Sequence, residues 1–307
     1  MAGTFTHLLV AEKAINTFMN MDAEKEHMII VAKNQKYITL GSNAPDFPYV
    51  AKQPKWADRM HYEKSSKIVK KAIRLLKRLE ETNHSSFEKC FSWFLGFLSH
   101  MTTDVSIHPI VNKIAGPYRA SIENQRKHQL CETHMDCYIF KEMANELSLK
   151  EAEYINDKIK TGCDSKNSVL IDHDIKDFWE AIMTEVYDDS EGLNADIWFF
   201  SYAELTDKIS EESGSTISSF LAARFGQENL VQITYETRED SYIKQLETPN
   251  GQRIDYIDLF KFAVKNTATL WKDFSDSLAN DSGIPKILKK DWDLDSGESN
   301  NKSIYWE

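Results

Sequence analysis

The chain has 307 residues, of which 41% are hydrophobic and 11% aromatic, so it can bury a large core. Its formal net charge of −11 argues against a protein that binds nucleic acid by neutralising phosphates, and no stable nucleic-acid complex is expected. The first residues lack the basic and apolar regions of a signal peptide, and no apolar run approaches the roughly 18 residues of a membrane span. A cytoplasmic protein without a transmembrane segment is therefore expected.

The first fifty residues predict two helices followed by a loop. Apolar side chains recur at helical spacing over residues 6–20, and a second helix is expected at residues 23–36. Two prolines, a glycine and an asparagine then mark residues 40–49 as a loop. Because this loop is apolar, we expect it to pack inward and to present Asp46 at a fixed place.

Three further helices are expected before the middle of the chain. A long helix over residues 62–81 precedes a very apolar helix that begins near residue 85. A residue that precedes proline is pushed out of helical geometry, so the apolar helix should end near His108, just before Pro109. The next helix should cover residues 120–147.

The second half is also predicted to be helical, so the expected fold class is all-α. A polar, glycine-containing stretch separates a helical core, residues 1–165, from a C-terminal part, residues 166–307, that should pack on the same domain. Residues 232–236 and 248–252 form either a small hairpin or a loop, and the last twenty residues should fray apart from Trp306. The other helices are expected at residues 149–160, 175–187, 200–210, 216–225 and 255–277.

Imidazole and carboxylate side chains recur every four residues in two of these helices. His100, Asp104 and His108 follow the apolar run, and His128 and Glu132 repeat the step in the next helix. A step of four returns a side chain to nearly the same helix face, although the early helix end should turn His108 elsewhere. Buried imidazoles and carboxylates are costly unless a cation neutralises them, and zinc accepts both as ligands. The pattern therefore predicts a metal site in the N-terminal core.

These residues, together with earlier ones, resemble the motifs of the zinc-dependent phospholipase C family of bacteria, whose general site is shared by single-strand-specific zinc nucleases. The resemblance covers residues 5–140 and implies an all-helical fold with three zinc ions in a cleft. The motifs are, in chain order, Gly41-x-x-x-Pro45-Asp46, His61, His100-x-x-x-Asp104-x-x-x-His108-Pro109 and His128-x-x-x-Glu132.

The resemblance also implies how the ligands are shared among the ions. In the family, the third zinc uses the N-terminal amine and carbonyl, which removal of a leader exposes. In this chain, trimming of Met1 would leave the amine of Ala2 near His7. Two or three zinc ions are expected, and iron or manganese would suit the same donors. The implied ligands are Asp46, His61, His100 and Asp104 for the first ion, His108, His128 and Glu132 for the second, and His7 with a bridging Asp104 for the third.

Ligand imidazoles also need acceptors that orient their second nitrogen, and Asp136 and Glu123 are the candidates. Four histidines fall outside the motifs and are expected to be ordinary hydrogen-bonded core residues. They are His27, His84, His134 and His173.

The chemistry that the resemblance implies is hydrolysis of a phosphoester or phosphodiester. Clustered zinc ions offset the charge of the phosphate and acidify water, and Asp46 would be both a ligand and the proton acceptor for the attacking water. The expected substrate is a small-molecule or lipid phosphoester. Two alternatives remain open: a nuclease or nucleotidase acting at the same site, and a non-catalytic protein in which metal ions only hold the helices together.

Overall fold

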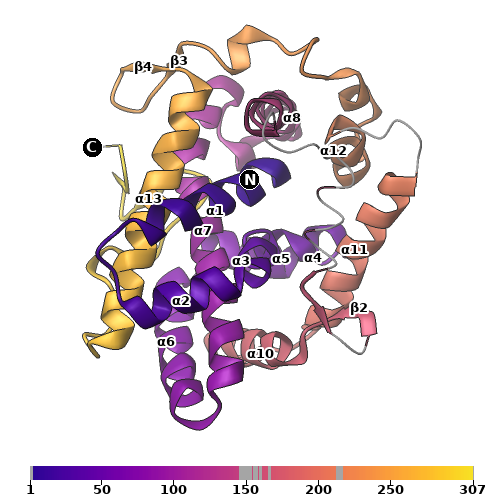
Figure 1. Ribbon diagram of the computed structural model, residues 1–307. Coiled ribbons are helices and arrows are strands. Elements are labelled where there is room, and N and C mark those ends of the chain that lie inside the picture. The colour runs from indigo at the N-terminus through magenta and orange to yellow at the C-terminus, as the bar shows by residue number, and fades with distance from the viewer. Residues whose placement is uncertain are drawn as a thin grey trace.

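Helices make up most of the computed structural model, which describes residues 3–144, 154, 158, 161–164, 167–211 and 217–306 (Figure 1). Within these residues the strands pair only as short two-stranded antiparallel hairpins. The all-α prediction is confirmed. None of the helices in this part of the chain has the length and hydropathy that a bilayer crossing requires.

The N-terminal part is a series of short helices, and two predictions about it are wrong. The second predicted helix is interrupted at Asn34, whose side-chain amide donates to the carbonyl of Ile30 at 3.1 Å. The predicted loop is helical, because Pro45 and Pro48 each lie in the first turn of a helix, where proline is tolerated. The elements are α1 (Thr4–Met19), α2 (Lys25–Lys33), α3 (Gln35–Gly41), η1 (Ala44–Asp46), α4 (Phe47–Val50) and α5 (Pro54–Tyr62).

The central helix does not end at His108, as the sequence predicts, but continues through Pro109. The C-terminal segment holds it on both sides of the proline. The indole nitrogen of Trp306 donates to the carbonyl of Ser106 at 3.0 Å, and the amide of Asn112 donates to the carbonyl of Asp295 at 2.6 Å. Tertiary hydrogen bonds thus override the local effect of proline. The elements here are α6 (Ser65–Thr82), α7 (His84–Ala115), η2 (Tyr118–Ala120) and α8 (Ile122–Ala144).

The remaining elements include most of the predicted C-terminal helices. Of the two alternatives for residues 232–236 and 248–252, the structure shows the loop, since neither segment forms a strand and β3 pairs with β4 across a turn formed by the second segment. The helix expected at residues 149–160 lies largely outside the described residues. The elements are β1 (Cys163–Asp164), β2 (Asn167–Ile171), α10 (His173–Tyr187), α11 (Ala195–Glu211), α12 (Ile217–Phe225), η3 (Glu228–Gln232), η4 (Asp240–Tyr242), β3 (Leu246–Glu247), β4 (Arg253–Ile254), α13 (Tyr256–Ala279), η5 (Lys286–Leu288), β5 (Glu298–Ser299) and β6 (Lys302–Ser303).

Residues 288–306 are packed against the protein, contrary to the prediction that the last twenty residues fray apart from Trp306. Trp292, Leu294 and Trp306 are buried, and the amide of Leu294 donates to the carbonyl of His61 at 3.0 Å. Gly297 has a φ of +69° and lies so close to Pro109 of α7 that a larger residue would collide with the proline ring. The end of the chain therefore belongs to the core.

Helix α7 is the centre of this core, and the other long helices surround it (Figure 1). Its apolar run, residues 91–98, is completely buried. Helices α1, α3, α6, α8, α10 and α13 all contact α7, so its sequence is apolar on every side rather than on one stripe. Elements from both predicted parts of the chain thus contribute to one hydrophobic cluster.

Helix α3 crosses α7 at two glycines, and this close approach places η1 beside the imidazoles of α7. A Cβ added at Gly41 would overlap the carbonyl of Trp93, and one added at Gly96 would overlap the carbonyl of Ile38. Both obstacles are backbone atoms, which cannot move aside as a side-chain end can. The crossing therefore depends on the absence of side chains at these two positions.

Gly96→Ala should therefore destabilise the protein by about 1–3 kcal/mol or more, because overpacking forces the two backbones apart. The midpoint of urea unfolding measures this change. Ser99→Ala is the matched control, since it removes an atom from a buried position one turn further along α7 and should cost under about 1 kcal/mol. Equal midpoints for Gly96→Ala and the wild type would show that the helices do not need this contact.

Candidate metal centre

All eight side chains predicted as metal ligands converge in one buried cluster. Each is at most 2% exposed. Helix α1 contributes one of them, η1 and α5 one each, α7 three and α8 two. Their positions are, in the same order, His7, Asp46, His61, His100, Asp104, His108, His128 and Glu132.

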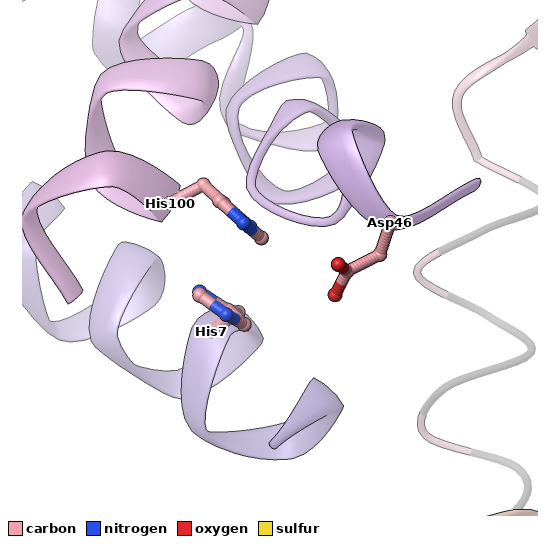
Figure 2. Close-up of side chains that lie close together, drawn as sticks. All are labelled: His7, Asp46 and His100. Atoms are coloured by element: carbon pink, nitrogen blue, oxygen red, sulfur yellow. The ribbon is translucent and has the colours of Figure 1, made fainter. Parts of the chain in front are cut away.

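The donor atoms of these residues form three groups in which all ligand atoms lie within 4.8 Å of one another. In the first group, the ring of His7 stacks on that of His100 at a centroid distance of 4.0 Å, and the carboxylate of Asp46 faces both rings (Figure 2). The groups are His7, Asp46 and His100; His61, His100 and Asp104; and His108, His128 and Glu132.

Asp104 connects the groups. Its Oδ1 lies 3.2 Å from Nε2 of His7 and 3.2 Å from Nε2 of His108. Its Oδ2 lies 3.2 Å from Nε2 of His100 and 3.7 Å from Nε2 of His61. One carboxylate thus touches imidazoles from three helices, which is the position expected of a ligand shared between ions.

His108 joins the cluster because α7 continues through the proline. Its Nε2 lies 3.6 Å from Oε1 of Glu132, which in turn lies 2.9 Å from Nε2 of His128. The expectation that His108 points away from His100 and Asp104 is wrong, because an unbroken helix keeps steps of four on one face.

Backbone carbonyls set the protonation of three imidazoles. Nδ1 of His61 lies 2.7 Å from the carbonyl of Ala57, and Nδ1 of His100 lies 2.9 Å from that of Ser42. Nδ1 of His108 lies 2.7 Å from the carbonyl oxygen of residue 294. A carbonyl oxygen only accepts hydrogen bonds, so each Nδ1 carries a proton, and the Nε2 of each neutral imidazole presents a lone pair to the cluster.

These lone pairs face partners that cannot satisfy them. Nε2 of His61 and Nε2 of His100 lie 3.1 Å apart, so two acceptors face each other. Nε2 of His108 faces the carboxylates of Asp104 and Glu132, which are acceptors as well. A cation that accepts electron pairs from all of them removes this conflict, so the donor set fits bound metal ions.

Residues 6–189 match the family model described as zinc dependent phospholipase C, and this segment contains all eight predicted ligands. The chain belongs to the zinc-dependent phospholipase C family. No curated protein and no solved structure matches the chain.

The electrostatics of this phospholipase C-type cluster favour the metal-binding protonation state at His7, His128 and Asp104. Burial acts to lower the pKa of His100 and of His108, but the charge of Asp104 outweighs it and raises both. Burial, reinforced by His100, lowers the pKa of His7 to about 4, and burial lowers that of His128 to about 4. Burial acts to raise the pKa of Asp104, but His108, His100 and His7 outweigh it and hold that pKa well below its usual range. Neutral imidazoles and ionised carboxylates are the forms that coordinate cations.

The two residues expected to orient ligand imidazoles do something else. Asp136 is buried and accepts hydrogen bonds from the backbone amides of Phe5 and Thr6 at 3.0 and 2.8 Å, so it caps the start of α1. It thereby fixes the helix that carries His7, but not the imidazole itself. Glu123 is exposed and forms an ion pair with Lys127 at 2.8 Å. Backbone carbonyls perform the orienting role instead.

Another group of potential ligands, Asp172, His173 and Asp174, has a different explanation. The ammonium of Lys89 lies 3.0 Å from the carboxylate of Asp172 and 2.7 Å from that of Asp174, so a cationic side chain already pairs with both. His173 is 70% exposed, so it is a surface residue rather than the core residue that was expected. We assign no metal to this group.

Sequence reasoning missed one charged residue of the centre, Arg224 of α12. Its side chain is 2% exposed, and its Nη2 lies 2.7 Å from Oδ2 of Asp46. A single arginine in the otherwise uncharged run of residues 217–225 was the only signal. The proposed contribution of the Ala2 amine lies outside the described residues.

Proposed function

We propose that this member of the zinc-dependent phospholipase C family is a metal-dependent hydrolase that cleaves a phosphoester or phosphodiester of a small molecule or lipid. The observation that carries the proposal is the cluster of imidazole lone pairs and carboxylates, which come from five helical elements and lie within one buried centre. Such a donor set contains no cysteine, unlike most closed structural zinc sites.

The ions would number two or three, and zinc is the metal that the family implies. Zinc ions, when bound, supply Lewis acidity, which offsets the charge of a phosphate group and lowers the pKa of water. The first group of donors, which includes Asp46, would hold one ion, and Asp104 would be shared between the groups. His108, His128 and Glu132 would hold a further ion.

Asp46 is the residue that we propose accepts a proton from the attacking water. Its carboxylate points into the cluster from the end of η1, with Oδ1 3.5 Å from Nε2 of His61 and Oδ2 paired with Arg224. Burial acts to raise the pKa of Asp46, but Arg224 and His100 outweigh it and lower that pKa, so the side chain is an ionised carboxylate. An ionised carboxylate is the form that can accept a proton.

Asp46→Asn should reduce phosphoester turnover by about 10²–10⁴-fold, because the amide cannot accept the proton. The metal-loaded protein would be assayed with bis-p-nitrophenyl phosphate, p-nitrophenyl phosphate, phosphatidylcholine vesicles and single-stranded DNA. Asp58→Asn, which changes an exposed aspartate of α5, is the matched control and should leave turnover unchanged. Hydrolysis of DNA alone would favour a nuclease, and stabilisation by metals without any turnover would favour a structural centre.

A further inference from the structure

We propose that Arg224 binds the phosphate group of the substrate, so that α12 adds an anion-binding residue to the metal centre. This inference rests on the proposed function, because it names the chemical group that the centre receives. It also assigns a role to a residue beyond the segment 6–189 that matches the family model.

Two contacts place the guanidinium group of Arg224 inside the centre. One is the ion pair with Oδ2 of Asp46, and the other is a hydrogen bond from Nη1 to the hydroxyl of Thr4 at the start of α1. The residue lies near the C-terminal end of α12, which packs against α8 and η3. The side chain therefore reaches from the C-terminal part of the chain to the proposed proton acceptor.

The net charge of the metal centre indicates what the guanidinium group of Arg224 binds. The predicted ligands include three carboxylates, Asp46, Asp104 and Glu132, and the centre adds one guanidinium. With neutral imidazoles the net charge of the centre is −2, and two divalent ions would change it to +2. If Arg224 only neutralised Asp46, the metal ions would take over that role. Arg224 would then be a buried cation beside other cations, which is costly.

An anion removes that cost, and phosphate is the anion that fits. A phosphate group brings negative charge and several oxygen acceptors, which the planar, forked guanidinium can bind with two parallel hydrogen bonds. A neutral ester or a cationic group would leave the excess positive charge of the loaded centre uncompensated. Arg224 therefore favours substrates that present an ionised phosphate, whether as an ester or as the free ion.

The test is to titrate inorganic phosphate into metal-loaded wild-type and variant protein by calorimetry, with metal content measured in the same samples. Arg224→Gln should weaken phosphate binding by about 10–100-fold, the size of one or two charge-assisted hydrogen bonds. Arg224→Lys keeps the positive charge beside Asp46 but lacks the fork, so it should retain the metals and bind phosphate several-fold more weakly. Dimethyl phosphate, titrated in parallel, separates recognition of an ester from recognition of the free ion.

Arg238→Gln is the matched control. Its guanidinium lies over the ring of Tyr235 at 3.9 Å, away from the predicted ligands, so the change should leave phosphate affinity unaltered. Wild-type phosphate affinity in Arg224→Gln at equal metal content would overturn the inference. Loss of metal in Arg224→Gln together with wild-type phosphate affinity in Arg224→Lys would overturn it as well, because the only role of Arg224 would then be to pair with Asp46.

The same measurements separate this inference from the proposed function. If phosphate binds through Arg224 and no ester is hydrolysed, the proposed hydrolase is wrong while the anion-binding role stands. If esters are hydrolysed equally well by wild type and Arg224→Gln, and both bind phosphate equally, the function stands and the role of Arg224 is wrong.

Discussion

Asp104→Asn is expected to remove metal from more than one group of the centre and to reduce phosphoester hydrolysis by about 10³-fold or more. Loss of a residue that merely orients a ligand costs 10–100-fold, and Asp104 is placed as a shared ligand, so its loss should cost more. The carboxylate lies within 3.2 Å of imidazoles from α1 and from two positions of α7. Asparagine keeps the shape but loses the charge that would hold two cations close together.

Metal content after desalting, measured by inductively coupled plasma mass spectrometry, is the direct readout for Asp104→Asn. Circular dichroism would establish that the variant retains its helices. Asp174→Asn is the matched control, because it removes a carboxylate from the group that Lys89 neutralises. If Asp104→Asn keeps the full complement of ions, Asp104 is not a shared ligand and the three groups are independent.

Removal of the metals should lower the melting temperature of the wild-type protein by about 12 °C. Two ions, each present at a thousand times its dissociation constant, contribute about 8 kcal/mol to folding. A chain of 307 residues gains about 0.6 kcal/mol per kelvin in entropy on unfolding, and the ratio gives the shift. The physical source is the cluster of facing imidazoles and carboxylates, whose negative charge Arg224 offsets only in part.

Scanning calorimetry before and after dialysis against EDTA measures this shift. Restoring zinc, manganese or iron to separate samples ranks the metals by the stability that each returns. Asp104→Asn should show little response to EDTA, since it starts with fewer ions. An unchanged melting temperature in wild-type protein whose metal content has fallen to zero would mean that the cluster is stable without cations.

Five of the eight predicted ligands follow from short-range spacing, whereas His7, Asp46 and His61 were predicted from the resemblance to the family. Steps of four in α7 and α8 place imidazoles and carboxylates on one face of each helix, whatever surrounds them. The apolar run before His100 also indicates burial correctly, because a helix that is apolar all round must lie in a core. The fold class follows from the same helical periodicity.

The features that could not be predicted depend on contacts between distant segments. The continuation of α7 through Pro109 depends on hydrogen bonds with residues 295 and 306, which no local sequence pattern predicts. The pairing of Arg224 with Asp46 joins residues that are 178 positions apart, and only the folded chain brings them together. The C-terminal segment is polar in composition, so its burial could not be read from hydropathy.

The attachment of that segment also has a consequence for biosynthesis. The carbonyl of Leu294 receives the Nδ1 proton of His108, a residue that the ribosome adds 186 positions earlier. At about 5–20 residues per second, translation takes roughly 10–40 s to span that interval. A nascent chain thus carries all eight predicted ligands well before their arrangement is complete, and any ion captured early would meet a disordered set of donors. Maturation of this protein is therefore expected to be a late event, in which metal insertion follows the folding of the final segment.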